Sequence, residues 1–305
     1  MAREPRRVCT WTPLHKALRH FATYEGPTQS AQHIKPLHWY VACRLVLEGG
    51  FRPEDVTPRP PFRSEALTKE TALLHFDPAV ATGSERTVLG GLKTKNVDVV
   101  VAQDGLGPVV GISCKGMTGA LRNLTNRMEE LIGECTNLHI TYPALVFGFL
   151  FLLRANRQVE EAAAEVAVGR RELQANDIGF GGDGPVATVV RFHNALQQIT
   201  GRRGIRNDVS RYEAVSLMAV EAAGPRIGER LDDFPTPESH LRFEQFFETL
   251  YRRYDERFVF GAPDLTGTTF RRMWSPESPA FQPSDLLPSH SLEGMDFEPR
   301  VGEVG

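Results

Sequence analysis

The chain of 305 residues is 41% hydrophobic and 24% charged, a composition typical of a soluble globular protein with one large domain or two modest ones. Its formal net charge of -3 at pH 7 excludes a uniformly basic coat protein for nucleic acid, so a polyanionic partner would have to bind at a local basic patch. The four cysteines, at positions 9, 43, 114 and 135, form no Cys-x-x-Cys pair, which favours reduced thiols and a cytoplasmic location.

No segment predicts insertion into a membrane. The longest strongly apolar run, Ala144–Leu153, has ten residues, about half of the roughly 20 that a helix needs to span a bilayer. This run is better interpreted as a buried strand. The first ten residues are basic but lack the apolar stretch of a secretory signal, so we expect no targeting segment and no membrane partner.

The first half of the chain combines helical patterns with a hairpin. Residues 1–60 carry short helical patterns and end in the proline-rich stretch TPRPPF, which predicts a helical region followed by a linker. A capping serine and the apolar residues of SEALTKETALLHF predict a further helix from Ser64. Two valine-rich runs, Val97–Ala102 and Val109–Lys115, flank the loop QDGLGP, a pattern that predicts a β-hairpin.

The second half alternates helices and strands. Apolar residues spaced three or four apart predict a one-sided helix over residues 120–135. The next segment, HITYPALVFGFLFLL, is apolar on both faces, as expected for a strand inside a sheet covered by helices. NRQVEEAAAEVAVGRREL and residues 186–200 predict helices, and GFGGDGP between them predicts a flexible break. YEAVSLMAVE predicts another strand, and FEQFFETLYRRYDERF predicts an amphipathic helix.

Together these elements predict an α/β fold in which helices flank a central mixed β-sheet. The helical N-terminal region would occupy residues 1–60, and the main domain residues 61–272. From about Ser275 the chain is rich in Pro, Ser and acidic residues, so residues 273–305 are expected to form a poorly ordered tail.

Asp98 and Lys115 are charged residues within the apolar hairpin strands. Because side chains alternate along a strand, Ser113 and Lys115 share one face, whereas Cys114 points to the other, toward the core. The hairpin would bring Asp98 to the side of Lys115. One interpretation of this pair is a plain salt bridge. The other is a site for phosphodiester cleavage, which needs carboxylates to hold a divalent cation and a positive group near the phosphate.

The order of these features resembles the PD-(D/E)XK nuclease superfamily, which has the restriction-endonuclease-like fold. Its signature is an aspartate at the start of one strand, a variable hairpin, (D/E)xK in the next strand, then a helix and a further buried strand. The matching parts are Asp98, the loop, Ser113-Cys114-Lys115, the helix from about Ala120, and TYPALVFGFLFLL. The resemblance implies an endonuclease that uses Mg²⁺, with Mn²⁺ as a substitute, to cleave double-stranded DNA in restriction or other anti-phage defence.

The chain departs from the signature at Ser113, because a serine cannot supply the charge of an aspartate or glutamate and would weaken Mg²⁺ binding. The following helix offers acids instead. A helical wheel favours Glu130, the spacing from Lys115 favours Glu129 almost equally, and Glu134 follows one turn later. Each of them is also interpretable as a solvated surface charge. A last group of candidate ligands lies upstream: Glu65, Glu70 and Glu85.

The resemblance also implies a role for each residue. Asp98 and a helix glutamate would bind one or two cations, and Lys115 would orient or activate the attacking water. Ser113 would hydrogen-bond a metal-bound water. Cys114 is interpreted as a small buried apolar residue rather than a nucleophile, because it points to the core face.

Two groups of polar residues suit contacts with DNA. The first group begins the helix after Lys115 and comprises Arg122, Asn123, Asn126 and Arg127. The second lies in the loop GRRGIRNDVSR and comprises Arg202, Arg203, Arg206 and Arg211. Either group is also interpretable as a solvated surface, and for the loop the two interpretations have equal weight.

Two other functions fit the sequence. One is a nucleic-acid-binding or assembly protein of the same fold that has lost catalysis with the acid at Ser113. The other is a structural protein in which Asp98 and Lys115 only form a salt bridge. Cleavage of both strands of a duplex favours a homodimer by symmetry. The resemblance also allows another subunit of a defence system as a partner.

Overall fold

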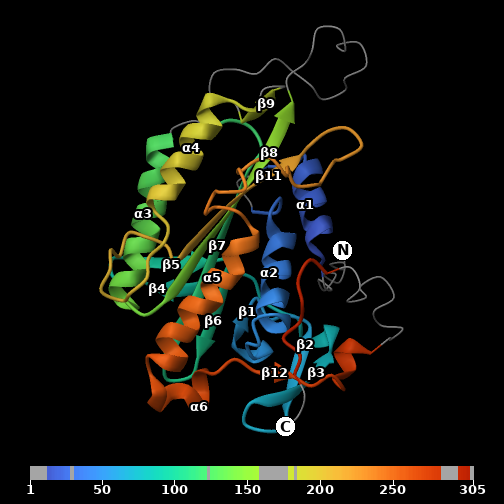
Figure 1. Ribbon diagram of the computed structural model, residues 1–305, viewed down its shortest axis with the longest axis vertical. Helices are drawn as coiled ribbons and strands as arrows, with labels where there is room; N and C mark the ends of the chain where they lie inside the picture. The colour runs from blue at the N-terminus through green and yellow to red at the C-terminus, as the bar shows by residue number, and fades with distance from the viewer. Residues whose placement is uncertain are drawn as a thin grey trace, which may run out of the picture.

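The computed structural model describes residues 12–27, 31–121, 124–157, 178–181, 184–282 and 295–302. A mixed seven-stranded sheet runs along the molecule, with helices on both of its faces (Figure 1). This arrangement confirms the predicted α/β fold with a central mixed sheet. Within the described residues, no helix has the length and apolarity that crossing a bilayer requires.

The centre of the sheet is formed by the elements that the sequence predicted best. β6 (Val99–Gln103) and β7 (Gly107–Met117) form the antiparallel hairpin, and β8 (Val146–Arg157) pairs in parallel with β7. On one side, β1 (Val56–Thr57) pairs antiparallel with β6. On the other side, β11 (Ala214–Glu221) pairs in parallel with β8. β9 (Gly179–Gly181) pairs in parallel with the end of β8, and β10 (Gly184–Pro185) pairs antiparallel with β9.

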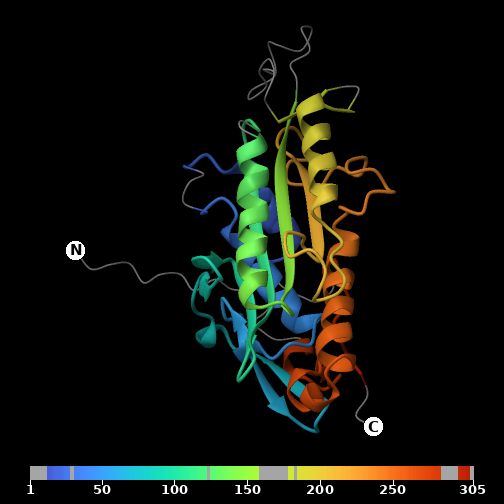
Figure 2. The same ribbon diagram turned by 90° about the vertical axis from the view of Figure 1, so that its left-hand side faces the viewer.

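Five helices of the described residues cover the sheet. One face carries α1 (Leu14–Thr23), α2 (Lys35–Leu47) and α5 (Glu244–Tyr254), and the other carries α3 (Leu124–Thr141) and α4 (Ala187–Gln198). Figure 2 shows α3 and α4 lying side by side over the sheet. α2 is buried along most of its length, since its sequence is apolar nearly all round. α1 and α2 therefore share one hydrophobic core with the sheet.

Strand alternation decides which residues face each layer of helices. Ile112 and Cys114 of β7 belong to the core on the α2 side, whereas Phe149 and Phe151 of β8 belong to the core on the α3 side. Gly148 lets α5 approach closely, because a Cβ atom at this position would lie 2.7 Å from the ring of Phe246.

Two smaller sheets flank the main one. Their strands are β2 (Phe62–Ala66), β3 (Thr71–Phe76) and β12 (Met273–Trp274) in the first, and β4 (Arg86–Leu89) with β5 (Thr94–Val97) in the second. Short helical segments connect the larger elements: η2 (Pro53–Asp55), η3 (Pro78–Val80), η5 (Asp255–Phe260), η6 (Pro263–Leu265), α6 (Thr266–Thr269) and η7 (Pro279–Phe281).

The helix predicted from Ser64 is wrong, because residues 62–76 form the hairpin of β2 and β3. The hydroxyl oxygen of Thr68 accepts hydrogen bonds from the backbone N–H groups of Glu70 and Thr71. This threonine turn reverses the chain where a helix would have to continue.

The other predicted elements after the hairpin are found with shifted ends. α3 starts later than the predicted helix and continues to Thr141, where Pro143 follows and prevents further helix. Residues 186–200, 212–221 and 243–258 contain α4, β11 and α5, as predicted. The alanine-rich stretch predicted to be helical lies outside the described residues from residue 158 onward.

The described C-terminal residues 295–302 pack against α2. The hydroxyl of Tyr40 donates to Oδ2 of Asp296 at 2.7 Å, and the backbone N–H of Arg300 donates to the carbonyl oxygen of Leu47 at 2.8 Å. Phe297 is 8% exposed and joins the core on this side. Part of the segment that was expected to be loose is thus tied to the main core.

Candidate functional site

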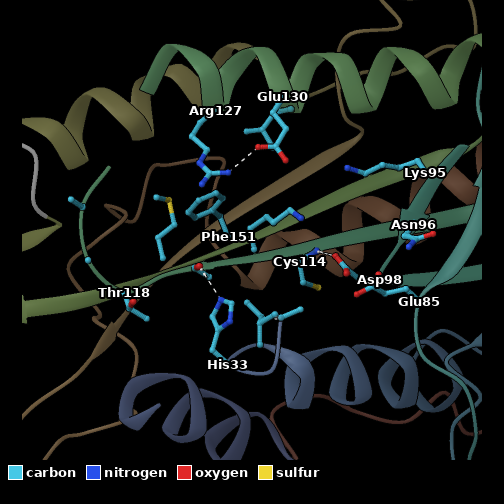
Figure 3. Close-up of a pocket in the computed structure, with 18 of the residues that line it drawn as sticks. His33, Glu85, Lys95, Asn96, Asp98, Cys114, Thr118, Arg127, Glu130 and Phe151 are labelled. Atoms are coloured by element: carbon cyan, nitrogen blue, oxygen red, sulfur yellow. Dashed lines mark hydrogen bonds and ion pairs between the residues drawn. The ribbon is translucent and has the colours of Figure 1, made fainter. Parts of the chain in front are cut away.

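A pocket of about 900 Å³ lies where β7 runs past the end of β6 (Figure 3). Its walls are the end of β7, the strand β5, the N-terminal half of α3 and the loop between α1 and α2. The charged residues in its lining are Glu85, Lys93, Lys95, Asp98, Lys115, Arg127 and Glu130. The carboxylate and the ammonium singled out in the sequence therefore face one space.

Asp98 occupies the junction between β5 and β6, and its carboxylate completes the open edge of β7. The last residue pair between β6 and β7 is Val99 with Ile112, but β7 continues to Met117 with β8 as its neighbour. Oδ2 of Asp98 accepts a hydrogen bond from the backbone N–H of Cys114 at 2.6 Å, in place of a strand carbonyl. Asp98 is 7% exposed, and it therefore has a structural contact as well as access to the pocket.

Burial raises the pKa of Asp98, although the N–H of Cys114 and the positive charge of Lys115 both act to lower it. The desolvation effect is the larger one. A cation placed against this carboxylate would remove the penalty, because it favours the ionised form.

Lys115 lies on the α3 side of β7, half-buried in the lining of the pocket. Among the described residues it has no hydrogen-bond or ion-pair partner. The salt bridge between Asp98 and Lys115 that the sequence allowed is therefore not formed. A half-buried ammonium that faces a pocket without a partner is available to bind an anion.

The acids of α3 are placed differently from one another. Glu130 lines the pocket and forms an ion pair with Arg127 at 2.9 Å, whereas the exposed Glu129 is not part of the lining. Glu134 is 4% exposed and accepts a hydrogen bond from the hydroxyl of Ser113 at 2.6 Å. The acid that reaches Ser113 is thus Glu134, one turn beyond the residue that the helical wheel favoured.

Lys95 binds the same acid from the other side. Its Nζ atom lies 3.2 Å from Oε2 of Glu134, so the serine and the lysine both hold this carboxylate. Because the hydroxyl of Ser113 is used in this contact and its side chain is buried, the serine does not face the pocket as the resemblance implied. Ser113 fixes the helix to the sheet.

Asn137 of α3 positions the lysines that precede Asp98. Its Oδ1 accepts hydrogen bonds from the N–H groups of Leu92 and Lys93, and its Nδ2 donates to the carbonyl oxygen of Lys93. Gly90 makes this possible, since a Cβ atom there would lie 2.0 Å from the Asn137 amide. Sequence reasoning missed Lys93 and Lys95, although the run KTKN immediately before the strand was a visible signal.

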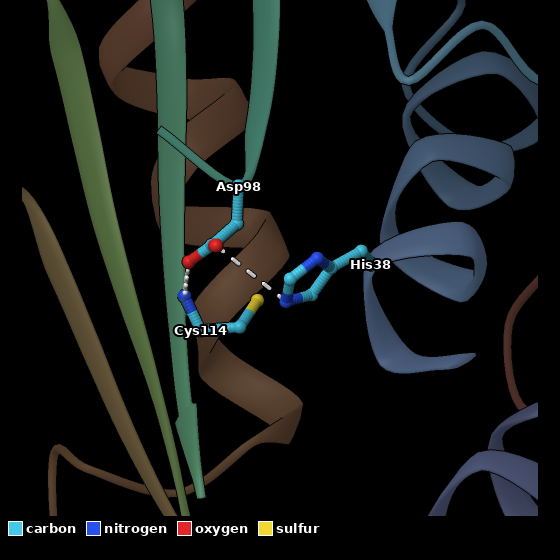
Figure 4. A group of neighbouring side chains, drawn as sticks. All are labelled: His38, Asp98 and Cys114. Carbon is cyan, nitrogen blue, oxygen red and sulfur yellow. Dashed lines mark hydrogen bonds and ion pairs between the residues drawn. The ribbon is translucent and has the colours of Figure 1, made fainter. Parts of the chain in front are cut away.

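One group of potential metal ligands is found among the described residues, and it includes Asp98. His38 of α2, Asp98 and Cys114 each place one ligand atom so that the three atoms lie within 4.8 Å of one another (Figure 4). Burial lowers the pKa of His38 to about 4, and burial raises the pKa of the Cys114 thiol well above its usual value. The high thiol pKa agrees with the interpretation that Cys114 is not a nucleophile. Sequence reasoning missed His38.

The upstream glutamates separate into two places. Glu85 lines the pocket, but Glu65 lies on β2 with its carboxylate 3.2 Å from His75, and Glu70 belongs to the turn that joins β2 to β3. Only Glu85 of the three lines the pocket.

The first group of predicted DNA contacts is only partly at the pocket. Arg127 lines it, whereas Asn126 is exposed outside the lining, and Arg122 and Asn123 lie outside the described residues. Arg127 is therefore the residue of this group for which a contact with bound phosphate is supported.

The second predicted group lies at the other end of α3. His139, near the C-terminal end of that helix, contacts the carbonyl oxygen of Val209 in this loop at 3.0 Å. His139 comes twelve positions after Arg127 on this helix, which corresponds to about 18 Å along the helix axis. The loop arginines with exposed side chains are Arg203, Arg206 and Arg211. These arginines do not converge with the pocket.

Arg202 requires a correction, because its side chain is 0% exposed and cannot contact DNA. Its guanidinium pairs with the equally buried carboxylate of Glu213 at 2.8 Å, and Arg257 pairs with the same carboxylate at 2.6 Å. His139 lies 3.5 Å from it. Arg202 therefore belongs to a buried charge network, and its neighbour Arg203 is the exposed member of the pair.

Comparisons with known proteins find no match for this chain among family models, curated proteins or solved structures.

Proposed function

We propose that the protein is a metal-dependent nuclease that hydrolyses phosphodiester bonds of DNA in the pocket between β7 and α3. The observation that carries the proposal is that Asp98, just before β6, and Lys115 of β7 line one pocket, and that the ammonium of Lys115 has no partner among the described residues. A nuclease needs this combination of a carboxylate for a cation and a positive group for the phosphate.

The order of elements supports the proposal. An aspartate at the start of β6, the hairpin to β7, the helix α3 and the parallel strand β8 follow one another as in the superfamily that the sequence resembles. Lys115 ends the apolar part of β7 beside that helix. Because one fold can host many functions, the nuclease proposal rests mainly on the residues of the site rather than on the topology.

Asp98 and Glu130 line the pocket and are the residues that would hold Mg²⁺. Among the described residues, no group of three potential ligands contains both of these acids. That donor set still fits the ion, because Mg²⁺ commonly binds through one or two carboxylates and completes its coordination with water and substrate phosphate. When bound, the cation would supply Lewis-acid stabilisation of the charge that develops on the phosphate.

The residues of the chain would divide the remaining tasks. Lys115 would orient the attacking water and stabilise negative charge on the phosphate, since its ammonium is not engaged elsewhere in the described structure. Lys93 and Arg127 would bind phosphates beside the scissile one. The contact of Ser113 with Glu134 would hold α3 at the distance from the sheet that keeps the pocket open.

A second function, nucleic-acid binding without cleavage, is supported by one observation. The carboxylate of Asp98 already accepts the Cys114 N–H and burial raises its pKa, so its affinity for Mg²⁺ is reduced. In this alternative the basic lining would bind DNA and no bond would be broken.

Incubation of the chain with plasmid DNA and Mg²⁺ or Mn²⁺ separates the two functions. We expect cleavage, and we expect both Asp98→Asn and Lys115→Met to slow it by at least about 100-fold while DNA affinity changes far less. Lys16→Met, on an exposed position of α1, is the matched control and should cleave at the wild-type rate. Metal-independent binding with no cleavage would support the binder, and wild-type cleavage by Lys115→Met would overturn the proposed site.

The biological setting follows from the resemblance and belongs to the same proposal. We propose double-stranded DNA as the substrate, two copies of the chain as the cleaving unit, and restriction or another anti-phage defence as the role. Sedimentation analysis with and without DNA tests the dimer, and unchanged monomers during cleavage of both strands would contradict it.

A further inference from the structure

Helix α2 and the β6–β7 hairpin, which are distant in sequence, bring a histidine, a carboxylate and a thiol together on the α2 side of β7. His38 lies on α2, Asp98 lies at the junction of β5 and β6, and Cys114 lies on β7 (Figure 4). Nothing in the local sequence around any one of them forms a metal-binding motif. Packing of α2 against the hairpin creates the cluster.

His38 carries an unsatisfied nitrogen aimed into this cluster. Its side chain is 6% exposed, and Nε2 has no hydrogen-bond partner in the described structure. Oδ1 of Asp98 lies 3.6 Å from Nε2, beyond hydrogen-bonding range. A buried polar atom without a partner costs free energy, and a bound cation would remove that cost.

The distances match the edges of a small coordination tetrahedron. Bonds of about 2.0–2.2 Å from Zn²⁺ to nitrogen and oxygen imply a nitrogen–oxygen edge of about 3.4 Å. The observed separation between His38 and Asp98 is 3.6 Å. The sulfur of Cys114 lies within 4.8 Å of both atoms, and a movement of about 1 Å would bring it to the edge length that a thiolate ligand requires.

The donor types select the class of metal. Imidazole nitrogen and thiolate sulfur are ligands for Zn²⁺ and related transition metals, whereas Mg²⁺ takes oxygen ligands. Binding would replace the thiol proton by the metal, and that proton would leave to solvent. The other described cysteines, Cys43 and Cys135, belong to no such group of three among the described residues.

We propose that His38, Asp98 and Cys114 form a binding site for Zn²⁺ or a similar transition-metal ion, which shares Asp98 with the proposed oxygen-ligand site for Mg²⁺. Asp98 and Cys114 also line the pocket, so the ion enters from there. This binding does not depend on nuclease activity. One consequence does rest on the proposed function: because Asp98 is shared, an occupied site withdraws the aspartate from the Mg²⁺ position and inhibits cleavage.

Cobalt(II) titration of the chelator-treated chain tests the site without DNA. We expect one equivalent to bind with visible bands of tetrahedral cobalt and a sulfur-to-cobalt charge-transfer band, and Zn²⁺ to displace it. Cys114→Ser should remove the charge-transfer band, and His38→Gln should weaken binding at least about tenfold. Cys135→Ser, a buried cysteine outside the group, is the matched control and should retain the band.

Two results would overturn the site: no stoichiometric binding of cobalt or zinc, or a charge-transfer band that persists in Cys114→Ser. The variant Lys115→Met distinguishes failure of the proposed zinc site from failure of the proposed nuclease function. This variant should bind cobalt like the wild type but should not cleave DNA. Inhibition of Mg²⁺-dependent cleavage by one equivalent of Zn²⁺ is the expected result for the shared aspartate. Undiminished cleavage by the zinc-loaded chain would refute the sharing.

Discussion

Replacement of Arg202 by methionine distinguishes a structural arginine from a DNA contact. In the folded chain Nη1 donates to Glu213 at 2.8 Å, and Nη2 donates to the carbonyl oxygens of Pro143 and Ile205, both at 3.0 Å. Methionine would fill much of the same space but supplies no N–H group. The adjacent Arg203 has an exposed side chain and provides a control of the same chemistry.

The expected loss of unfolding free energy in Arg202→Met follows from the hydrogen-bonding groups that are left without a partner. Two backbone carbonyls would lose their donors, at about 1 kcal/mol each. The buried carboxylate of Glu213 would lose one of its guanidinium partners, but Arg257 at 2.6 Å remains. The total therefore lies at the lower end of the range for breaking a buried ion pair, about 3 kcal/mol of unfolding free energy. Arg203→Met should change this quantity by less than about 0.5 kcal/mol.

Urea denaturation followed by circular dichroism measures the stability, and a DNA-binding titration of both variants measures the affinity. We expect Arg202→Met to be destabilised and, where it is folded, to bind DNA like the wild type. If the loop contacts DNA, Arg203→Met alone should bind more weakly. Wild-type stability of Arg202→Met together with reduced DNA affinity would refute the assignment of this arginine to the core.

Three further perturbations probe other contacts. Burial acts to raise the pKa of Glu213, but the hydrogen bond with His139 and nearby positive charges outweigh it and leave the pKa below its ordinary value of 4.5. The resulting stabilisation is complete above about pH 4.5 and is lost as the pH falls through the folded-state pKa. The loss of unfolding free energy in Glu213→Gln should therefore be largest at about pH 7 and should decrease as the pH is lowered below about 4.5; a loss that stays constant over this range would contradict this. Phe297→Ala should cost about 3 kcal/mol by leaving a cavity beside α2, measured by denaturation, and a cost below about 1 kcal/mol would show that the C-terminal segment does not support the core. Ser113→Ala should cost about 1–3 kcal/mol because a buried oxygen of Glu134 loses its donor; unchanged stability would contradict the contact.

Much of the fold could be predicted because its signals are local. The hairpin of β6 and β7, the buried strand β8 and the amphipathic helices are each determined by alternation or helical spacing within one segment. The hairpin at residues 62–76 could not be separated from a helix, because adjacent leucines and a serine cap suit both. The hydrogen bonds that the Thr68 side chain accepts form the turn that makes this segment a hairpin rather than a helix.

The candidate site could be predicted only as far as strand pairing reaches. The hairpin register brings Asp98 and Lys115 to one pocket. A helical wheel gives the face of α3 but not the height of the helix over the sheet, and so it could not identify Glu134 as the partner of the serine. His38 lies on a helix 60 residues before the aspartate, and only tertiary packing brings them together. The composition of the loop could not show that Arg202 is buried whereas Arg203 is exposed.

The open edge of β7 has a consequence for how copies of the chain behave toward one another. An unpaired strand edge is a template on which another polypeptide can add a strand and start aggregation. Here Asp98 accepts the Cys114 N–H, and Nε2 of His33 donates to the carbonyl oxygen of Gly116 at 3.1 Å. These side chains occupy hydrogen-bonding positions that an invading strand would need. The groups at the mouth of the pocket would therefore also keep the protein monodisperse, and variants that lack them would form intermolecular sheets more readily.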